Sequence, residues 1–340
     1  MVFCLHSKSD LINLSETLKR SAGLNRNISL DILKLIMAFM VVGIHSGFLD
    51  DISAVGRYIT VNGLFRIAVP VFLVINGFFF YSSLESQTVA KWFKRILVLY
   101  AFWTLVYIYF WFPSEISAFG IAKIIKTILV GHNHLWYLPA MIGAAAVLYF
   151  VRNLSSALLF SASIALFAAG AAMQYAGNYH LFSNPTLDKV VNTLWLYRNF
   201  LFFAFPFFCI GYLFKRTGYY KKIQRGHAII AALIGIGLLM GESYFDFSAQ
   251  ENAQGFDIFG SLIFACPFIF LVALSSQVQG SSKSLALYST AIYFVHPLFI
   301  SAIDAYVAMG GTAKAFAVGI ASTIAAAIII KLNTRVKIML

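Results

Sequence analysis

A membrane-length apolar segment near the start of the chain carries three ionisable residues. Residues 26–48 read RNISLDILKLIMAFMVVGIHSGF and include Asp31, Lys34 and His45. An ionisable side chain at membrane depth is costly, so it usually faces a protein interior or a water-filled cavity. Lys34 and His45 are eleven residues apart, which places them on one face of an α-helix and about 16 Å apart along its axis. One helix face therefore presents a cation near one end and a titratable imidazole near the other.

Four other apolar segments also carry polar side chains. They read FRIAVPVFLVINGFFFYS (65–82), GHNHLWYLPA (131–140), WLYRNFLFFAFPFFCIGYLF (195–214) and LYSTAIYFVHPLFI (287–300). The residues of interest in them are Arg66, Asn76, His134, Trp136, Arg198, Tyr293 and His296. A simple membrane anchor needs none of these, but each also has a plainer interpretation. An arginine can snorkel to the interface, aromatic residues can form an interfacial belt, and a histidine can bridge two helices.

The composition places these segments in a multi-pass membrane protein. The 340 residues are 60% hydrophobic and only 11% charged, with a mean hydropathy of +0.81, whereas about 25% of residues are charged in a soluble domain. We therefore predict an all-α polytopic protein of the cell (inner or plasma) membrane, in contact with membrane lipid. The formal net charge of +12 does not indicate a nucleic-acid partner, because the basic residues are divided among short loops.

Ten apolar runs are candidate spans. They lie near residues 28–49, 62–82, 96–112, 134–151, 154–174, 197–214, 227–241, 257–274, 285–306 and 312–331, and the third and seventh are short. With the N-terminus inside, most of the 25 Lys and Arg residues fall on inner segments and most acidic residues on outer ones. The positive-inside rule then predicts about ten transmembrane helices with both termini cytoplasmic. Residues 1–25 would form an amphipathic cytoplasmic segment, 26–332 the membrane domain and 333–340 a short cytoplasmic tail.

The cysteines and histidines do not indicate a metal site. Cys4, Cys209 and Cys266 are too few and too scattered for a disulfide framework or a metal-binding motif. The His-x-His pair of His132 and His134 has no third ligand nearby in the sequence. We therefore expect no metal. The sequence carries no signal for an oligomeric state.

Several of these segments together resemble the acyltransferase-3 family of integral-membrane acyltransferases. The resemblance extends from Arg26 to about residue 330. It rests on R-x-x-x-L-D ending at Asp31, a basic-x10-His pair, R-x-A-V-P-V-F-x-x-x-N-G-F in the second run, H-L-W-Y-L in the fourth, Arg-Asn in the sixth and I-Y-x-x-H-P in the ninth. Each motif is weak alone, but their order makes the set fairly specific.

The resemblance implies transfer of an acetyl group from acetyl-CoA to a hydroxyl of a surface polysaccharide, or of a glycolipid or lipid-linked saccharide precursor. On this reading the catalytic candidates are His45, Asp31 and Arg66. His45 would act as the base or as an acyl carrier, because an imidazole can accept a proton near neutral pH. The candidates for binding the coenzyme are Lys34, Arg66, Asn76, Arg198 and Trp136, and further candidates are His134, Tyr293 and His296.

Two residues depart from the family pattern. Lys34 stands where the family usually has arginine, and it keeps the charge but loses the planar fork that grips phosphate or carboxylate at two points. Asn76 stands where the family usually has serine, and both side chains offer hydrogen bonds.

Other classes of protein also fit part of the pattern. A secondary transporter or permease for a small polar or anionic solute would equally explain intramembrane histidine, arginine and proline, although no inverted repeat is evident. A structural membrane protein would need neither His45 nor a ligand.

Overall fold

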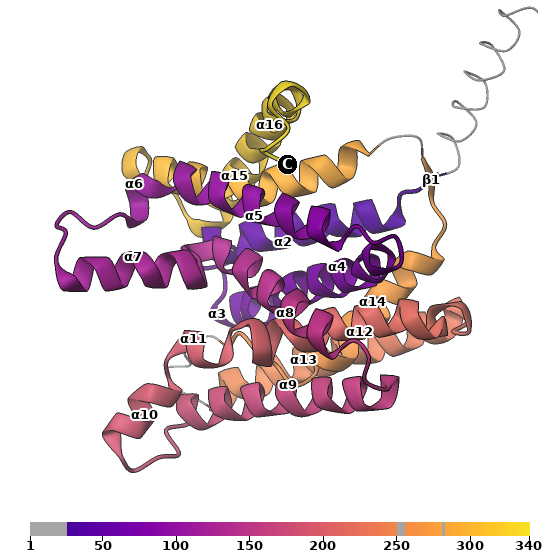
Figure 1. Ribbon diagram of the computed structural model, residues 1–340. Helices are drawn as coiled ribbons and strands as arrows, with labels where there is room; N and C mark the ends of the chain where they lie inside the picture. Colours follow the sequence, from indigo (N-terminus) through magenta and orange to yellow (C-terminus); the bar gives the residue numbers. More distant parts are fainter. Residues whose placement is uncertain (1–25, 250–255, 281–282) are drawn as a thin grey trace, which may run out of the picture.

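The computed structural model describes residues 26–249, 256–280 and 283–340, and this part of the chain is almost entirely helical (Figure 1). Two short strands, β1 (Arg26–Asn27) and β2 (Gln279–Gly280), pair antiparallel. The predicted cytoplasmic segment 1–25 lies outside the described residues.

Eight helices in the described part are long and apolar enough to cross a membrane. They are α2 (Ser29–Ser46), Ala54–Glu85, Asn133–Val151, α9 (Ser156–Asn178), Phe200–Thr217, α13 (Arg225–Ala249), α15 (Ser284–Tyr306) and α16 (Gly311–Val336). Three of these begin irregularly, so that α4 (Ala68–Glu85), α8 (Tyr137–Val151) and α12 (Phe205–Thr217) form their regular parts. The predicted all-α polytopic membrane fold is confirmed.

The other two predicted spans are also helical, but each fails one requirement. α5 (Val89–Val106) has 18 residues but carries Lys91, Lys94 and Arg95 near its start, and it continues into α6 (Ile108–Trp111). α14 (Leu262–Ser275) has 14 residues, or about 21 Å of helix, against a hydrocarbon core about 30 Å thick. The number ten and the orientation therefore stay predictions. The shorter helices are α3 (Ala54–Arg57), α7 (Ala118–Val130), α10 (Pro185–Val191) and α11 (Leu194–Tyr197).

Three helix boundaries differ from the predicted ones. The seventh run, predicted to be short, is part of the 25-residue helix α13, which includes Glu242 and Asp246. α14 begins at Leu262 rather than at 257, so Asp257 lies in a loop. α16 continues to Val336, and only the last four residues leave the helix.

Helices α4 and α12 cross at two glycines. A Cβ at Gly77 would overlap the backbone carbonyl of Phe208, and a Cβ at Gly211 would overlap that of Val74. Small residues of this kind let membrane helices approach closely and gain van der Waals contact. Phe80, Phe207 and Phe208 are fully buried beside the crossing. The crossing fixes α4, and with it Asn76, against the rest of the bundle.

Helix α2 packs against helices from both ends of the chain. It contacts α4, α14, α15 and α16, and Figure 1 shows it running beside α4 and α15. Ser289 of α15 donates a hydrogen bond to the backbone carbonyl of Lys34, 2.8 Å away. The pairing of β1 with β2 anchors the start of α2, because Ile28 N–H donates to Val278 O at 2.9 Å. The helix that carries Lys34 and His45 is thus held inside the bundle.

Candidate functional site

Three of the predicted site residues lie on irregular helical turns, and a fourth lies next to one. Arg66 is in a 3₁₀ turn (Leu64–Ile67) that follows a π-helical turn (Tyr58–Gly63). His134 and Trp136 are in a 3₁₀ turn (Asn133–Trp136), and Arg198 lies two residues before a π-helical turn (Phe200–Ala204), which Asn199 caps. Such turns are frequent at functional sites, and backbone of this kind is tolerated at membrane depth where it lines a protein interior.

Asp257 bridges the two arginines. Its Oδ2 accepts a hydrogen bond from Arg198 at 2.9 Å, and its Oδ1 pairs closely with Arg66. The carboxylate is only 11% exposed. Burial would raise the pKa of Asp257, but Arg66 and Arg198, with a smaller contribution from His45, outweigh burial and hold that pKa below its usual value of 3.8. Two neighbouring cations are therefore held together by one ionised carboxylate.

Side chains from two other helices hold the loop of Asp257. Gln174 of α9 accepts hydrogen bonds from the backbone N–H groups of Asp257 and Ile258 at 2.9 and 3.0 Å, and its amide donates to Ile258 O at 2.8 Å. Glu242 of α13 accepts hydrogen bonds from Gly260 N–H at 2.6 Å and Ser261 N–H at 2.9 Å. These bonds satisfy backbone groups that helical bonding would otherwise satisfy, and they fix the carboxylate.

Three imidazoles lie beside one another inside the bundle. The ring centroid of His296 is 5.4 Å from that of His45 and 5.3 Å from that of His134. His296 and His134 are buried, at 0% and 1% exposure. They come from α15, α2 and the start of α8, which are far apart in sequence.

The imidazole of His45 lies inside the helix bundle. It is exposed to a water-sized probe, although Ala38 and Val41, which lie on the same helix face one and two turns earlier, are buried. It contacts the buried ring of His296 and interacts electrostatically with Asp257. The imidazole therefore lies among other side chains of the bundle and stays reachable by a water-sized probe.

A second polar region lies toward the other end of α2. A pocket of about 270 Å³ is lined by residues that include Lys34, Asn76, Arg95, Tyr137 and Tyr293. The amide of Asn76 donates hydrogen bonds to Tyr137 Oη and to Phe72 O, both at 2.9 Å. Lys34 Nζ is 3.7 Å from the carboxylate of Asp31, which is 3% exposed. This pocket, which we call the lysine pocket, combines two cations with a wall of aromatic and aliphatic side chains.

A single layer of aromatic side chains separates the lysine pocket from the histidines. Tyr293 lines the pocket and also contacts His134, with ring centroids 5.5 Å apart. Its hydroxyl donates to the backbone carbonyl of His134. Tyr137 and Phe72 both pack edge-on against Tyr293. One residue, Tyr293, thus belongs to both regions.

The structure brings most of the predicted site residues into these two regions. His45, Arg66, Arg198, His134 and His296 form the histidine–arginine region, where Trp136 stacks on the Arg198 guanidinium at 4.7 Å. Lys34, Asn76 and Asp31 belong to the other region. Asp31 precedes His45 by fourteen residues of one continuous helix, or about 21 Å along the axis, so the structure does not bring these two catalytic candidates together.

Sequence reasoning missed Asp257. The available signal was charge balance, because Arg66 and Arg198 both lie in apolar segments and needed a counterion. Among the described residues, no group of three or more His, Cys, Asp or Glu side chains is arranged to hold a metal ion.

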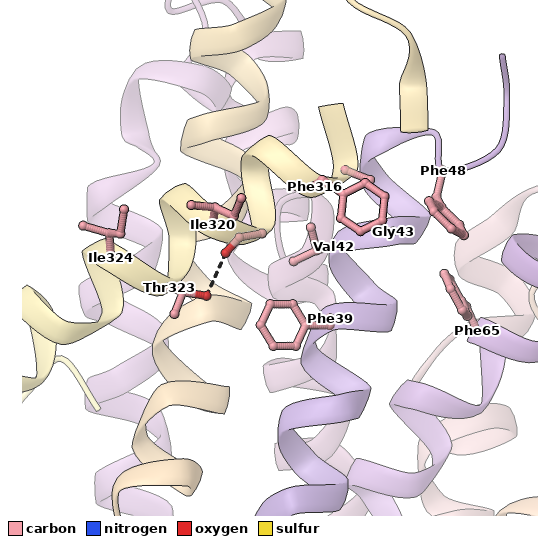
Figure 2. A pocket seen from close by; sticks show the side chains of 11 residues that line it. Phe39, Val42, Gly43, Phe48, Phe65, Phe316, Ile320, Thr323 and Ile324 are labelled. Carbon is pink, nitrogen blue, oxygen red and sulfur yellow. Dashed lines mark hydrogen bonds between the residues drawn. The ribbon is translucent and has the colours of Figure 1, made fainter. Parts of the chain in front are cut away.

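A large apolar groove opens on the outside of the bundle, between α2 and α16. It has a volume of about 500 Å³ and is lined by Phe39, Val42, Gly43, Phe48, Phe65, Ala315, Phe316, Gly319, Ile320, Thr323 and Ile324. Figure 2 shows Phe48 and Phe65 lying beside each other at one end of it. Phe65 directly precedes Arg66, and Gly43 belongs to the same helix as His45, so this groove shares two helical elements with the histidine–arginine region.

The structure is a helical membrane bundle with imidazoles and guanidinium groups inside it. Together with the comparison to known families, it makes the protein an integral-membrane acyltransferase. A family model described as an acyltransferase domain matches residues 27–332. The chain belongs to the acyltransferase-3 family, as the motifs indicated.

Its curated relatives carry a different name. A serine/alanine racemase of Enterococcus gallinarum is 25% identical over 291 residues, which is 81% of this chain and 41% of that protein. An amino-acid racemase of Enterococcus faecalis is 25% identical over 300 residues, again 81% and 41%. The chain thus spans about two fifths of these relatives, and racemisation is a property of those longer proteins. No solved structure matches the chain.

Proposed function

We propose that this protein is an O-acyltransferase of the inner or plasma membrane. It would move an acetyl group from acetyl-CoA to a hydroxyl of a cell-surface polysaccharide or of a glycolipid precursor. The observation that supports this most directly is the position of His45, an accessible imidazole inside the bundle. It interacts electrostatically with Arg66 and Arg198 and is separated by one aromatic layer from a pocket lined with cations.

The lysine pocket suits the donor. Lys34 and the exposed Arg95 supply positive charge for phosphates, and the positive-inside prediction puts this end of α2 in the cytosol, where acetyl-CoA is found. A volume of about 270 Å³ is large enough for an acyl-pantetheine arm but not for a whole coenzyme. The nucleotide would therefore stay at the mouth, and the thioester would reach the aromatic layer formed by Tyr293, Tyr137 and Phe72.

The histidine–arginine region suits the chemical step. His45 accepts the proton of the acceptor hydroxyl, and the oxygen attacks the thioester carbonyl carbon. Arg66 or Arg198 stabilises the negative charge that develops on the carbonyl oxygen, while Asp257 keeps both guanidinium groups in place. The carbon–sulfur bond then breaks, the ester forms and the thiolate takes the proton back from His45. If His45 is instead acylated first, the same residues serve both half-reactions.

The apolar groove supports an acceptor that is anchored in lipid. A hydrocarbon chain between α2 and α16 would bury its surface against Phe39, Phe316 and Ile320 (Figure 2). Because the groove adjoins Gly43 and Phe65, the polar end of such a lipid would lie next to His45 and Arg66. The acceptor would then be a saccharide carried on a membrane lipid.

The test is transfer of labelled acetyl groups from acetyl-CoA by purified protein in liposomes that contain glycolipid extracted from the host membrane. His45→Ala should reduce the rate by 100-fold or more, the usual contribution of a general base. His227→Ala, at an exposed position of α13, is the matched control and should keep the normal rate. An unchanged rate for His45→Ala would disprove the assignment.

A transporter would give different results in the same liposomes. For the acyltransferase, acetyl-CoA should raise the thermal midpoint of the protein more than sugars alone do, and hydrolysed or transferred acetyl should appear only with active protein. A transporter would accumulate solute without any acetylated product. A histidine that carries acetyl after rapid quenching would identify the acyl-histidine route.

A further inference from the structure

Helix α15 contains a proline one residue after a buried histidine. The helix runs from Ser284 to Tyr306 without a break, and Pro297 is inside it. Proline has no backbone N–H, so the carbonyl four residues earlier, that of Tyr293, receives no ordinary helical hydrogen bond. A buried carbonyl without a donor is costly, and another group usually satisfies it.

His296 satisfies this carbonyl with its own ring. Its Nδ1 is 2.8 Å from Tyr293 O and 3.2 Å from Ile292 O. Both partners are carbonyl oxygens and can only accept, so Nδ1 must carry the hydrogen. In a neutral imidazole, Nε2 then carries a lone pair and no hydrogen. The His-Pro sequence therefore selects one tautomer of His296.

The remaining nitrogen of His296 is buried and has no partner. Nε2 makes no hydrogen bond in the structure, and the residue is 0% exposed. With Nδ1 turned to the α15 backbone, Nε2 is on the side of the ring that faces other helices. The rings in contact there include those of His45 and His134, with centroids at 5.4 and 5.3 Å. A buried acceptor in this place requires a donor, and either neighbouring imidazole can supply one, since both ring nitrogens of the buried His134 also lack a partner.

We propose that His296 is a positioning residue for His45. Its Nε2 accepts a hydrogen bond from one ring N–H of His45, which leaves the other ring nitrogen of His45 as the lone pair that takes the proton of the acceptor hydroxyl. After that transfer the His45 imidazolium keeps its hydrogen bond to His296, so the new charge has a partner and no second proton needs to move. The role in proton transfer rests on the proposed function, whereas the hydrogen bond between His296 and His45 does not.

A spectroscopic measurement tests the geometry without any activity. Protein labelled with 15N-histidine is studied by NMR in lipid at neutral pH, and the signals of His296 and His45 are assigned by difference from His296→Asn and His45→Ala. His296 should show a protonated Nδ1 and a bare Nε2 that accepts a hydrogen bond, and His45 should be a single tautomer. His296→Asn should turn His45 into a tautomer mixture. A protonated Nε2 on His296, or a His45 spectrum that this variant leaves unchanged, overturns the proposal.

Two substitutions separate the positioning role from a structural one. Asparagine places its amide near Nδ1 and can still donate to Tyr293 O, whereas glutamine reaches the position of Nε2 and can accept there. His296→Gln should therefore retain more activity than His296→Asn, which should lower kcat about tenfold or more with little change in KM. Equal kcat values for the two variants would overturn the proposal.

Replacing the proline tests the origin of the tautomer. Pro297→Ala restores an N–H that competes for Tyr293 O, so the NMR spectrum should show a second tautomer of His296 in a folded protein. A single Nδ1–H tautomer in this variant would show that the proline does not select it. If His45→Ala stays active while the spectra are as expected, the proposed function fails and the hydrogen-bond geometry stands.

Discussion

Asp257 supplies the negative charge that allows Arg66 and Arg198 to lie close together. The two guanidinium groups would otherwise repel each other in a region with little solvent. Because Asp257 receives its position from Gln174 and Glu242 through backbone hydrogen bonds, the pair of arginines depends on residues of helices α9 and α13, which carry none of the predicted site residues.

Asp257→Asn should destabilise the protein and reduce transfer. Removing one partner of a largely buried ion pair costs about 3 kcal/mol, and here it leaves two cations side by side. We expect a clear drop in the thermal midpoint of the protein in detergent. Asp304→Asn is the control, because Asp304 is 52% exposed in its pair with Lys314 and exposed pairs contribute little. Equal midpoints for the two variants would contradict the role given to Asp257.

The lowered pKa of Asp257 also predicts how stability depends on pH. The folded protein favours the ionised carboxylate, so its pKa lies below the usual 3.8, which is close to the value in an unfolded chain. The stabilisation is therefore fully present at pH 5 and above, and it is lost as pH falls through the folded-state pKa. The difference in thermal midpoint between wild type and Asp257→Asn should be constant from pH 8 to 5 and shrink below pH 4. A difference that grows on acidification would contradict the sign of the shift.

Sequence reasoning found the two arginines but not their carboxylate. The stretch FDIFGS (256–261) is mostly apolar and continues into an apolar run, so it was read as the start of a span. It stays a loop because hydrogen bonds with Gln174 of α9 and Glu242 of α13 replace helical ones, and these side chains reach the loop only once the helices have packed. Similarly, the motif around His296 was visible, but its contact with His45 depends on the packing of α15 on α2.

At the scale of helices, the crossing of α4 and α12 is the tightest constraint on the bundle. Gly77 belongs to the Asn-Gly-Phe motif. The helix crossing explains why this position is a glycine, since any side chain there would meet backbone atoms of α12. The neighbouring Asn76 then reaches Tyr137 in the lysine pocket. Close helix packing and pocket geometry are thus two results of the same motif.

Gly77→Ala and Gly211→Ala should each force the two helices apart. The added methyl would meet backbone rather than a flexible side chain, so we expect a loss of stability of about 2–3 kcal/mol, in the range for overpacked cores. Gly237→Ala is the control, because a Cβ at this position of α13 meets nothing within 4 Å. It should be neutral or stabilising by up to about 1 kcal/mol. Thermal melts of the three variants in one detergent provide the comparison, and similar midpoints would show that the crossing can relax.

At the scale of the whole molecule, the two polar regions lie toward opposite ends of α2. Lys34 and Arg95 face the lysine pocket, and the three histidines lie beyond the aromatic layer of Tyr293. The spacing of Lys34 and His45 predicted this arrangement in outline, and hydropathy and loop charge predicted the membrane spans, because these are local properties of the sequence. They could not decide whether α5 and α14 cross the membrane, since one is rich in lysine and arginine near its start and the other is short.

Cysteine labelling in intact cells can decide that question. In a chain whose native cysteines are replaced, ten crossings place Gln87→Cys and Gln277→Cys inside and Glu115→Cys and Ser248→Cys outside. All four positions are exposed in the structure. A membrane-impermeant maleimide should label the second pair in intact cells and the first pair only after permeabilisation. Gln87 and Glu115 flank α5, and Ser248 and Gln277 flank α14. If the two positions that flank one helix are labelled alike, that helix does not cross the membrane.

The packing of α2 has a consequence for how the protein is made. Helix α2 is synthesised well before α15 and α16, which cover its polar face, and α15 completes the histidine cluster. Until they arrive, Lys34 and His45 have no neighbours from that end of the chain, in a lipid environment that disfavours both. The insertion machinery must therefore hold α2, or α2 must stay at the membrane surface, until α15 and α16 have been inserted. A chain halted before residue 284 should be recognised by quality-control proteases.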